Sequence, residues 1–288
     1  MPGYDQTVTM PSRSYVNQYT TRRYNEMEIQ RDGTLTEDDR AWNLCHGPRN
    51  YHILGAILKY LETQKPESLT ILNMSGMNEG KPDPVLFDLL ASHYDRANIS
   101  WAVIDHPESL TFTDPHVREW TEERGIRCIP HDHRKQSSPP DTPPADIVLC
   151  TEIIEHLDYS DMIALMRSCR AALKPGGLLL CTTPNVLFLG YRVVFALGHW
   201  DSLHHNDTPA HVDRGMTGHT IYYDAKRLTR LLRLLDFTDI EASTFNTGHG
   251  PGEFKNVLTR AAAIGVRALS HLVPNSGQVL LVLAHRPL

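Results

Sequence analysis

The chain has 288 residues, of which 41% are hydrophobic, so it can bury the core of one α/β domain with additions. Its net charge of −6 provides no overall basic field, which disfavours nucleic acid or an anionic membrane as a partner. No apolar run approaches the roughly 20 residues that span a bilayer, and the N-terminus lacks the apolar core of a secretory signal. We therefore expect a cytoplasmic protein whose five cysteines are free thiols.

Residues 1–65 predict a helical extension ahead of the main domain. Apolar residues at 54, 57, 58 and 61 follow the i, i+3, i+4, i+7 spacing of a helix with one apolar face. The segment is also rich in large aromatic residues, namely Tyr15, Tyr19, Tyr24 and Trp42. Such residues could wall an acceptor pocket as part of a lid, or they could belong to an ordinary decoration packed on the sheet. The sequence leaves both interpretations open.

Residues 66–288 alternate apolar runs with amphipathic segments, as an α/β domain does. The expected strands are residues 69–74, 99–105, 126–130, 146–150, 178–182, 238–245 and 278–285. The expected helices are residues 84–94, 115–124, 161–173, 187–197, 224–235 and 254–272. Four prolines between 136 and 144 predict a surface loop, and a histidine-rich polar loop spans about 199–222.

The most informative part of this domain is the segment from Ala145 to Asn185. It contains E-x-x-E-H-L at 152–157, L-K-P-G-G at 173–177 and T-P-N at 183–185. The order of strand, acidic loop, amphipathic helix, glycine turn and strand resembles the second half of a class I S-adenosylmethionine (SAM)-dependent methyltransferase. The resemblance implies an α/β fold with a seven-stranded, doubly wound mixed sheet whose last strand is antiparallel. It also implies methyl transfer from SAM to a small organic acceptor, for which we favour a hydroxyl oxygen.

The resemblance assigns the cofactor to the carboxyl ends of the strands. The implied cofactor-binding residues are Asn73, Ser75, Gly76, Glu79, Asp105, Asp132 and Thr151. Asn73 stands where the family usually has an acid, and the glycine motif after it is degenerate, although the amide still offers an acceptor oxygen. Asp105 matches the family's ribose-binding acid, because a carboxylate can accept hydrogen bonds from both ribose hydroxyls.

His156 and Glu152 are the catalytic candidates. Methyl transfer is an in-line displacement in which the enzyme mainly aligns the acceptor with the methyl group. A hydroxyl acceptor also benefits from a nearby base, and imidazole exchanges protons near neutral pH. The alternative interpretation is that the Glu155-His156-Leu157 segment only caps and packs the next helix.

Two further alternatives remain open. The E-x-x-E-H motif is similar to the metal motif of small-RNA 2′-O-methyltransferases, which would make Glu152, Glu155 and His156 ligands of a divalent metal together with a later histidine. We take His205 as that fourth ligand, with His204, His211 and His219 as the other candidates. The degenerate glycine motif is also compatible with a methyltransferase-like binding protein or a repurposed enzyme. We favour a small-molecule acceptor, no resident metal, no membrane or nucleic-acid partner, and allow for a homodimer.

Overall fold

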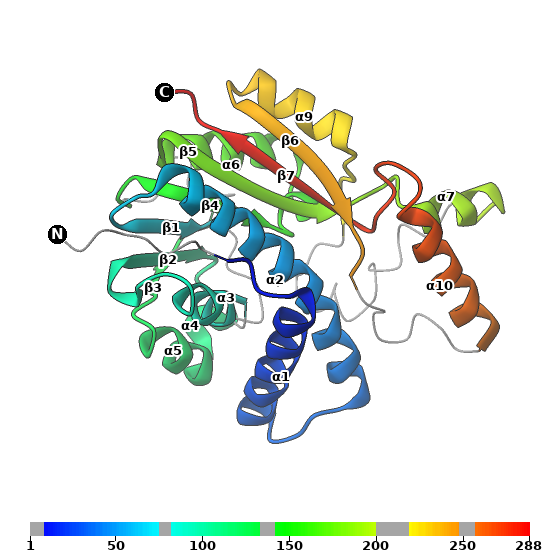
Figure 1. Ribbon diagram of the computed structural model, residues 1–288, viewed down its shortest axis with the longest axis horizontal. Coiled ribbons are helices and arrows are strands. Elements are labelled where there is room, and N and C mark those ends of the chain that lie inside the picture. Colours follow the sequence, from blue (N-terminus) through cyan, green and yellow to red (C-terminus); the bar gives the residue numbers. More distant parts are fainter. Residues whose placement is uncertain (1–8, 75–81, 133–141, 200–218, 248–256) are drawn as a thin grey trace.

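The computed structural model describes residues 9–74, 82–132, 142–199, 219–247 and 257–288. Seven strands form one sheet in the order β3-β2-β1-β4-β5-β7-β6 (Figure 1). The strands are β1 (Leu69–Asn73), β2 (Ile99–Asp105), β3 (Arg127–Pro130), β4 (Ala145–Thr151), β5 (Leu173–Pro184), β6 (Thr238–Phe245) and β7 (Val279–His285). Strands β1 to β5 pair in parallel, whereas β7 is antiparallel to both β5 and β6. This confirms the predicted doubly wound mixed sheet.

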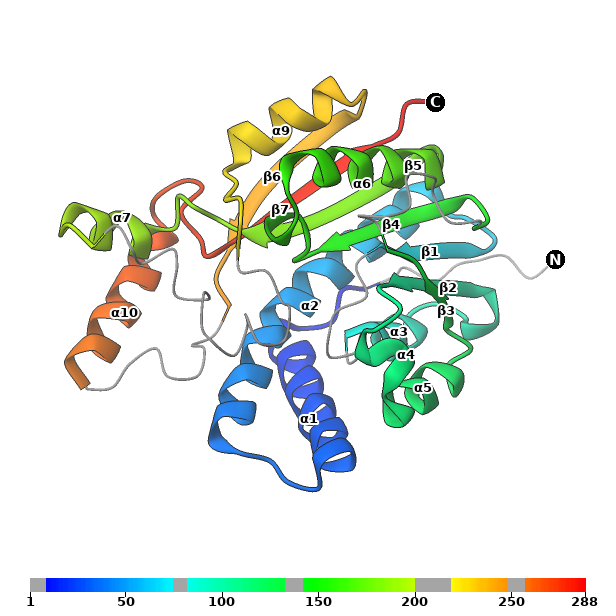
Figure 2. The same cartoon turned by 180° about the vertical axis from the view of Figure 1, so that it is seen from behind.

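Helices cover both faces of the sheet (Figures 1 and 2). They are α1 (Arg13–Asp32), α2 (Glu37–Gln64), α3 (Pro82–Ala91), α4 (Leu110–Thr113), α5 (Pro115–Glu122), α6 (Tyr159–Ala172), α7 (Leu189–Ala196), α9 (Ala225–Leu234) and α10 (Val257–Ser270). Two 3-10 turns, η1 (Arg96–Asn98) and η2 (Ile154–His156), complete the order. Among the described residues, no helix is both long enough and apolar enough to cross a membrane.

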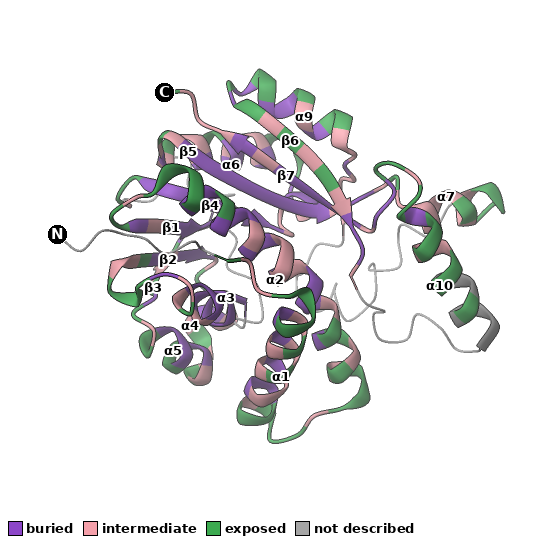
Figure 3. Ribbon diagram, in the orientation of Figure 1, coloured by how far each residue is buried: buried purple, intermediate pink, exposed green. Residues whose placement is uncertain are grey.

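The two-residue period of a strand divides the core into two layers. On β4, Ile147 and Leu149 face the layer formed with α1, α2, α3 and α5, whereas Val148 and Cys150 face the layer formed with α6 and α9. All residues of β4 are buried, as a doubly covered parallel strand requires. Figure 3 shows this buried centre; at one end of the molecule, α7 has no buried residue and the described side chains of α10 are mostly exposed.

The N-terminal extension is helical, as predicted, but part of it belongs to the main core. Tyr24 is fully buried together with Val16 and Met27, so its ring stabilises the fold and does not wall a pocket. Tyr15 and Trp42 are 49% and 45% exposed. The burial of Tyr24 favours the packed decoration, and the lid interpretation stays a prediction.

The predicted turn after α6 is a bulge within a longer strand. Leu173 already pairs with Ala145, the register then shifts, and Leu178 pairs with Ile147. Gly176 occupies the left-handed region at φ 76°, which a residue with a side chain seldom adopts. The glycine motif therefore forms a bulge inside β5 and does not end α6, which stops at Ala172.

Candidate functional site

The candidate site begins with polar side chains at the carboxyl ends of neighbouring parallel strands. Asn73 ends β1, Asp105 ends β2 and Thr151 ends β4, and Asp132 follows β3 by two residues. Parallel register brings these ends to one edge of the sheet, where Asn73 is opposite both Val103 and Leu149. All four polar side chains are buried. The predicted residues Ser75, Gly76 and Glu79 lie outside the described residues, so their assignment stays a prediction.

Asn73 is held by a buried acid that sequence reasoning missed. Its Nδ2 donates to Oδ1 and Oδ2 of Asp83 at 2.9 and 3.0 Å, and Trp101 Nε1 donates to Asp83 Oδ1 at 2.7 Å. Burial raises the pKa of Asp83 to about 6, against the lowering effect of these hydrogen bonds. Asp83 of α3 therefore supplies a carboxyl group in contact with Asn73, at the strand end where the family usually has an acid. In the sequence, the only sign of this buried acid was that position 73 has an asparagine where the family usually has an acid.

This buried carboxyl predicts a pH-dependent stability. Asp83 keeps its proton up to about pH 6 in the folded chain, whereas its ordinary pKa is 3.8. Its contribution to the free energy of unfolding is therefore full below pH 4 and lost as the pH rises through 6, a loss on the order of 3 kcal/mol. Urea unfolding at several pH values should show this slope in the wild type and a smaller one in Asp83→Asn. Equal slopes in the two proteins would contradict the assignment.

Asp105 and Asp132 form an acidic pair at the ends of β2 and β3. Asp105 Oδ2 accepts from Thr111 Oγ1 at 2.8 Å, and its Oδ1 accepts from the backbone N–H of His106 at 2.8 Å. His106 Nε2 lies 3.3 Å from Asp132 Oδ2. Burial raises the pKa of Asp105, while hydrogen bonds from Ser109 and Thr111 lower it. The structure thus brings together the two acids that the sequence proposed for the ribose and the adenine.

Glu152 lies immediately beyond β4 and pairs with a residue from the N-terminal extension. Arg49 Nη2 donates to Glu152 Oε2 at 3.0 Å, and the two side chains are only 14% and 15% exposed. Glu152 has a φ of 52°, a left-handed conformation that is uncommon for a residue with a side chain. Its backbone N–H donates to Thr182 O at 2.8 Å, and this hydrogen bond holds the residue after β4 against β5. Arg49 was not predicted, because nothing local in the sequence connects it to a residue 103 positions away.

Glu155, His156 and His219 come together beside this ion pair. One side-chain ligand atom from each lies within 4.8 Å of the others. Glu155 is 1% exposed, its Oε2 accepts from Thr183 Oγ1 at 2.9 Å, and its Oε1 has no hydrogen-bond partner among the described residues. Burial raises the pKa of Glu155 well above its usual range, and the charge of Glu152 adds to the increase. Of the four histidines considered as a further ligand, the structure brings His219 to the site, whereas His204, His205 and His211 lie outside the described residues.

The rings of His156 and His219 contact each other within this cluster. Their centroids are 4.9 Å apart at an interplanar angle of 68°, and His219 also contacts Tyr222 edge-on. Thr220 anchors this segment, because its N–H and Oγ1 donate to the carbonyl of Glu155 at 2.7 and 3.1 Å. The segment 219–222 is thereby fixed against the loop that carries His156.

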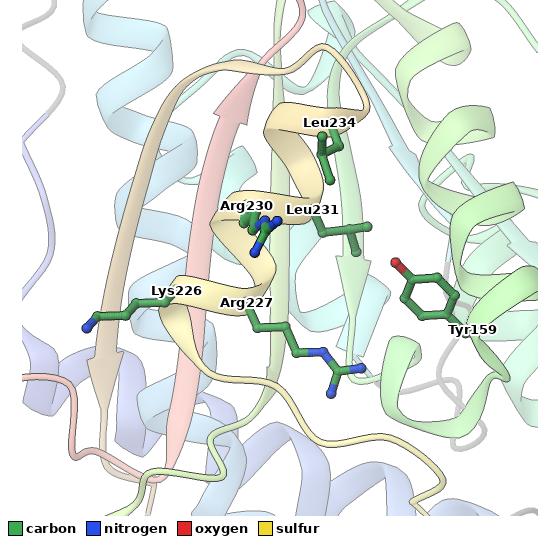
Figure 4. A pocket seen from close by; sticks show the side chains of 6 residues that line it. All are labelled: Tyr159, Lys226, Arg227, Arg230, Leu231 and Leu234. Carbon is green, nitrogen blue, oxygen red and sulfur yellow. The ribbon is translucent and has the colours of Figure 1, made fainter.

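A separate groove of about 430 Å³ lies between α6 and α9 (Figure 4). Tyr159 of α6 and basic and apolar side chains of α9 line it: Lys226, Arg227, Arg230, Leu231 and Leu234. None of the predicted site residues takes part. The chemistry of the candidate site is therefore located at the strand ends and not in this groove.

Comparison with known proteins places the chain among methyltransferase domains. Residues 76–242 match the profile of a protein family described as a methyltransferase domain. No curated protein sequence matches the chain. Similar solved structures include the CurJ carbon methyltransferase, with 11% sequence identity, a TM-score of 0.53, and coverage of 96% of this chain and 68% of that chain.

Two further structures share the fold. An O-methyltransferase family protein from Burkholderia thailandensis is 14% identical, with a TM-score of 0.50 and coverage of 96% of this chain and 70% of that chain. A putative methyltransferase from Haloferax volcanii, solved with the activator Trm112, is 14% identical, with a TM-score of 0.50 and coverage of 83% and 94%. At these identities the likeness concerns the fold and not the acceptor.

Proposed function

The chain belongs to the family of SAM-dependent methyltransferases, and we propose that it transfers a methyl group to a hydroxyl oxygen of a small organic acceptor. The observation that supports this proposal is the position of His156. It lies beyond the carboxyl end of β4, beside the buried Glu155 and within a cluster that also contains His219. A basic nitrogen at that edge of the sheet lies where the family brings acceptor and cofactor together.

The polar groups at the strand ends suit SAM. Asp105 and Asp132 offer carboxylate oxygens to the ribose hydroxyls and the adenine amino group, and Asn73 and Thr151 contribute polar groups at the neighbouring strand ends. When bound, SAM supplies a methyl group activated by a positively charged sulfur. The residues of the chain hold the cofactor at one edge of the sheet and leave the side of Glu152 and His156 for the acceptor.

In the proposed mechanism His156 acts as a general base. It takes the proton of the acceptor hydroxyl as the new carbon–oxygen bond forms and the carbon–sulfur bond breaks. Glu152 accepts a hydrogen bond from the acceptor and orients it for in-line attack. His156 holds the proton until it is lost to solvent.

The assignment of Asp105 predicts a loss of cofactor affinity in Asp105→Ala. We expect about 10–100-fold weaker binding of S-adenosylhomocysteine, because a hydrogen bond to a charged group is worth about 1.5–3 kcal/mol. Titration calorimetry measures this change, with Asp38→Ala, an exposed carboxylate of α2, as the control. A wild type that binds neither SAM nor its product would contradict cofactor use, and an unchanged affinity in Asp105→Ala would contradict the role of this residue.

The transfer itself is tested by incubation with methyl-labelled SAM and a fractionated metabolite extract, with the product read by mass spectrometry. A labelled small molecule whose new methyl group is bound to oxygen supports the proposal. Binding of SAM without any labelled product would support the methyltransferase-like binding protein instead.

A second candidate is a metal-dependent methyltransferase, favoured by the Glu155–His156–His219 cluster. A carboxylate and two imidazoles are suitable ligands for a divalent ion, and Glu155 Oε1 is a buried acceptor without a partner in the part of the chain that the structure describes. Glu152 faces Arg49 through Oε2, so it would join such a site only through Oε1. An RNA acceptor of the type that the sequence motif resembles is disfavoured by the net charge of −6.

A further inference from the structure

The N-terminal extension holds Arg49 in a fixed position at the candidate site. A Cβ on Gly47 would lie 2.8 Å from Asn17 Cα, so α2 and α1 cross closely just before Arg49. Polar contacts on both sides of this crossing lock the two helices, with Asn43 Nδ2 2.9 Å from Asn25 Oδ1 and Asn50 Nδ2 3.3 Å from Thr20 Oγ1. Figures 1 and 2 show the two helices side by side below the strand ends. The guanidinium is therefore placed by packing and not by a mobile loop.

The Arg49–Glu152 pair is only half satisfied. Arg49 uses Nη2 for Glu152 Oε2, and its Nη1 lies 3.4 Å from Nδ1 of His46. Arg49 Nε and Glu152 Oε1 are both buried, and neither has a hydrogen-bond partner in the described structure. Unpaired polar atoms at buried positions are rare and call for a ligand or a functional reason. The uncommon left-handed φ of Glu152 is a second feature of the kind that clusters at functional sites.

A second buried arginine of the chain forms a complete ion pair. Arg124 donates from Nε to Asp88 Oδ1 at 2.9 Å and from Nη2 to Asp88 Oδ2 at 2.8 Å. Its side chain is 8% exposed, and this two-pronged geometry satisfies both partners. The Arg124–Asp88 pair is therefore complete, whereas the Arg49–Glu152 pair leaves one donor and one acceptor open.

The two orphan atoms specify complementary ligand groups. Arg49 Nε requires a hydrogen-bond acceptor, and Glu152 Oε1 requires a donor. The Arg49–Glu152 ion pair carries no net charge, so it gives an anionic ligand no net electrostatic attraction. A neutral molecule with hydroxyls on adjacent carbons offers both groups at once. Trp42 lies on the same face of α2 and is 45% exposed, which leaves a ring face for the carbon skeleton of such a ligand.

We propose that the acceptor is a neutral vicinal diol of the carbohydrate or polyol class, held by Arg49 and Glu152. One hydroxyl donates to Glu152 Oε1, and the oxygen of the neighbouring hydroxyl accepts from Arg49 Nε. This inference rests on the proposed methyl transfer to a hydroxyl and names the molecule that carries it.

Periodate separates this inference from the proposed function, because it cleaves carbon–carbon bonds between adjacent hydroxyls. A metabolite extract is treated with periodate, quenched with excess sulfite, and then incubated with wild-type enzyme and methyl-labelled SAM. A second portion receives reagent that was quenched beforehand. We expect labelled product in the second portion and at least a tenfold loss in the first. Equal product in both portions overturns the diol while leaving methyl transfer intact, and no product in either overturns both.

The residue assignment is tested on the acceptor purified from that extract. Arg49→Lys keeps the positive charge beside Glu152 but removes the Nε donor, so we expect the KM for the acceptor to rise at least tenfold. The affinity for S-adenosylhomocysteine should not change. Arg124→Lys, which alters the fully paired buried arginine, is the matched control and should leave the KM unchanged. An Arg49→Lys enzyme with the wild-type KM, or a KM raised equally in both variants, overturns the role of Arg49.

Discussion

Replacing His156 with alanine should lower the turnover number by about 10²–10⁴-fold, the usual contribution of a general base. The residue lies away from the acids assigned to the cofactor, so the affinity for S-adenosylhomocysteine should stay at the wild-type value. Single-turnover rates with saturating labelled SAM measure the effect on chemistry directly. His116→Ala, which removes a half-buried histidine of α5, serves as the control for the loss of an imidazole elsewhere.

Chelation distinguishes the two roles that the cluster allows for His156. As a metal-free base, it should give a wild-type enzyme whose turnover is unchanged after dialysis against a chelator. As a ligand together with Glu155 and His219, it should give an enzyme that loses turnover in chelator and regains it with a divalent ion. An unchanged turnover in His156→Ala would rule out both roles and favour the interpretation in which this segment only packs against α6.

The strands of the sheet could be predicted closely, because their signals are local. The bounds of β2 and β6 agree with the sequence prediction; in β2 an apolar run ends at the polar Asp105. The bulge at Leu173 was missed, because Lys-Pro-Gly-Gly carries the same signals whether it forms a turn or bends a strand. Parallel pairing then determines which strand ends meet, which is why Asp105 and Asp132 could be predicted to lie together.

The extension could be predicted only in part, because tertiary packing overrides local preference there. Gly47 and Pro48 would ordinarily end a helix, yet both lie inside α2, which is 28 residues long. The close approach of Asn17 explains the glycine, and contacts with α1 and the sheet stabilise the rest. Arg49 could not be assigned to the site from the sequence, because its position depends on this packing and on the course of β4 far along the chain.

Tyr24 provides the sharpest test of how this extension contributes to the protein. Its ring is fully buried and lies 4.9 Å from the ring of His46, which in turn contacts Arg49. Tyr24→Ala should lower the free energy of unfolding by about 3–5 kcal/mol, the cost of removing a large buried aromatic side chain.

Tyr15→Ala is the matched control, because the same residue type lies in the same helix with a side chain that is 49% exposed. Its effect should stay within about 0.5 kcal/mol. Urea denaturation followed by circular dichroism measures both variants. If instead both variants unfold like the wild type and Tyr24→Ala raises only the KM for the acceptor, the aromatic residues of α1 would act on the substrate as a lid does, and the core role derived from burial would be wrong.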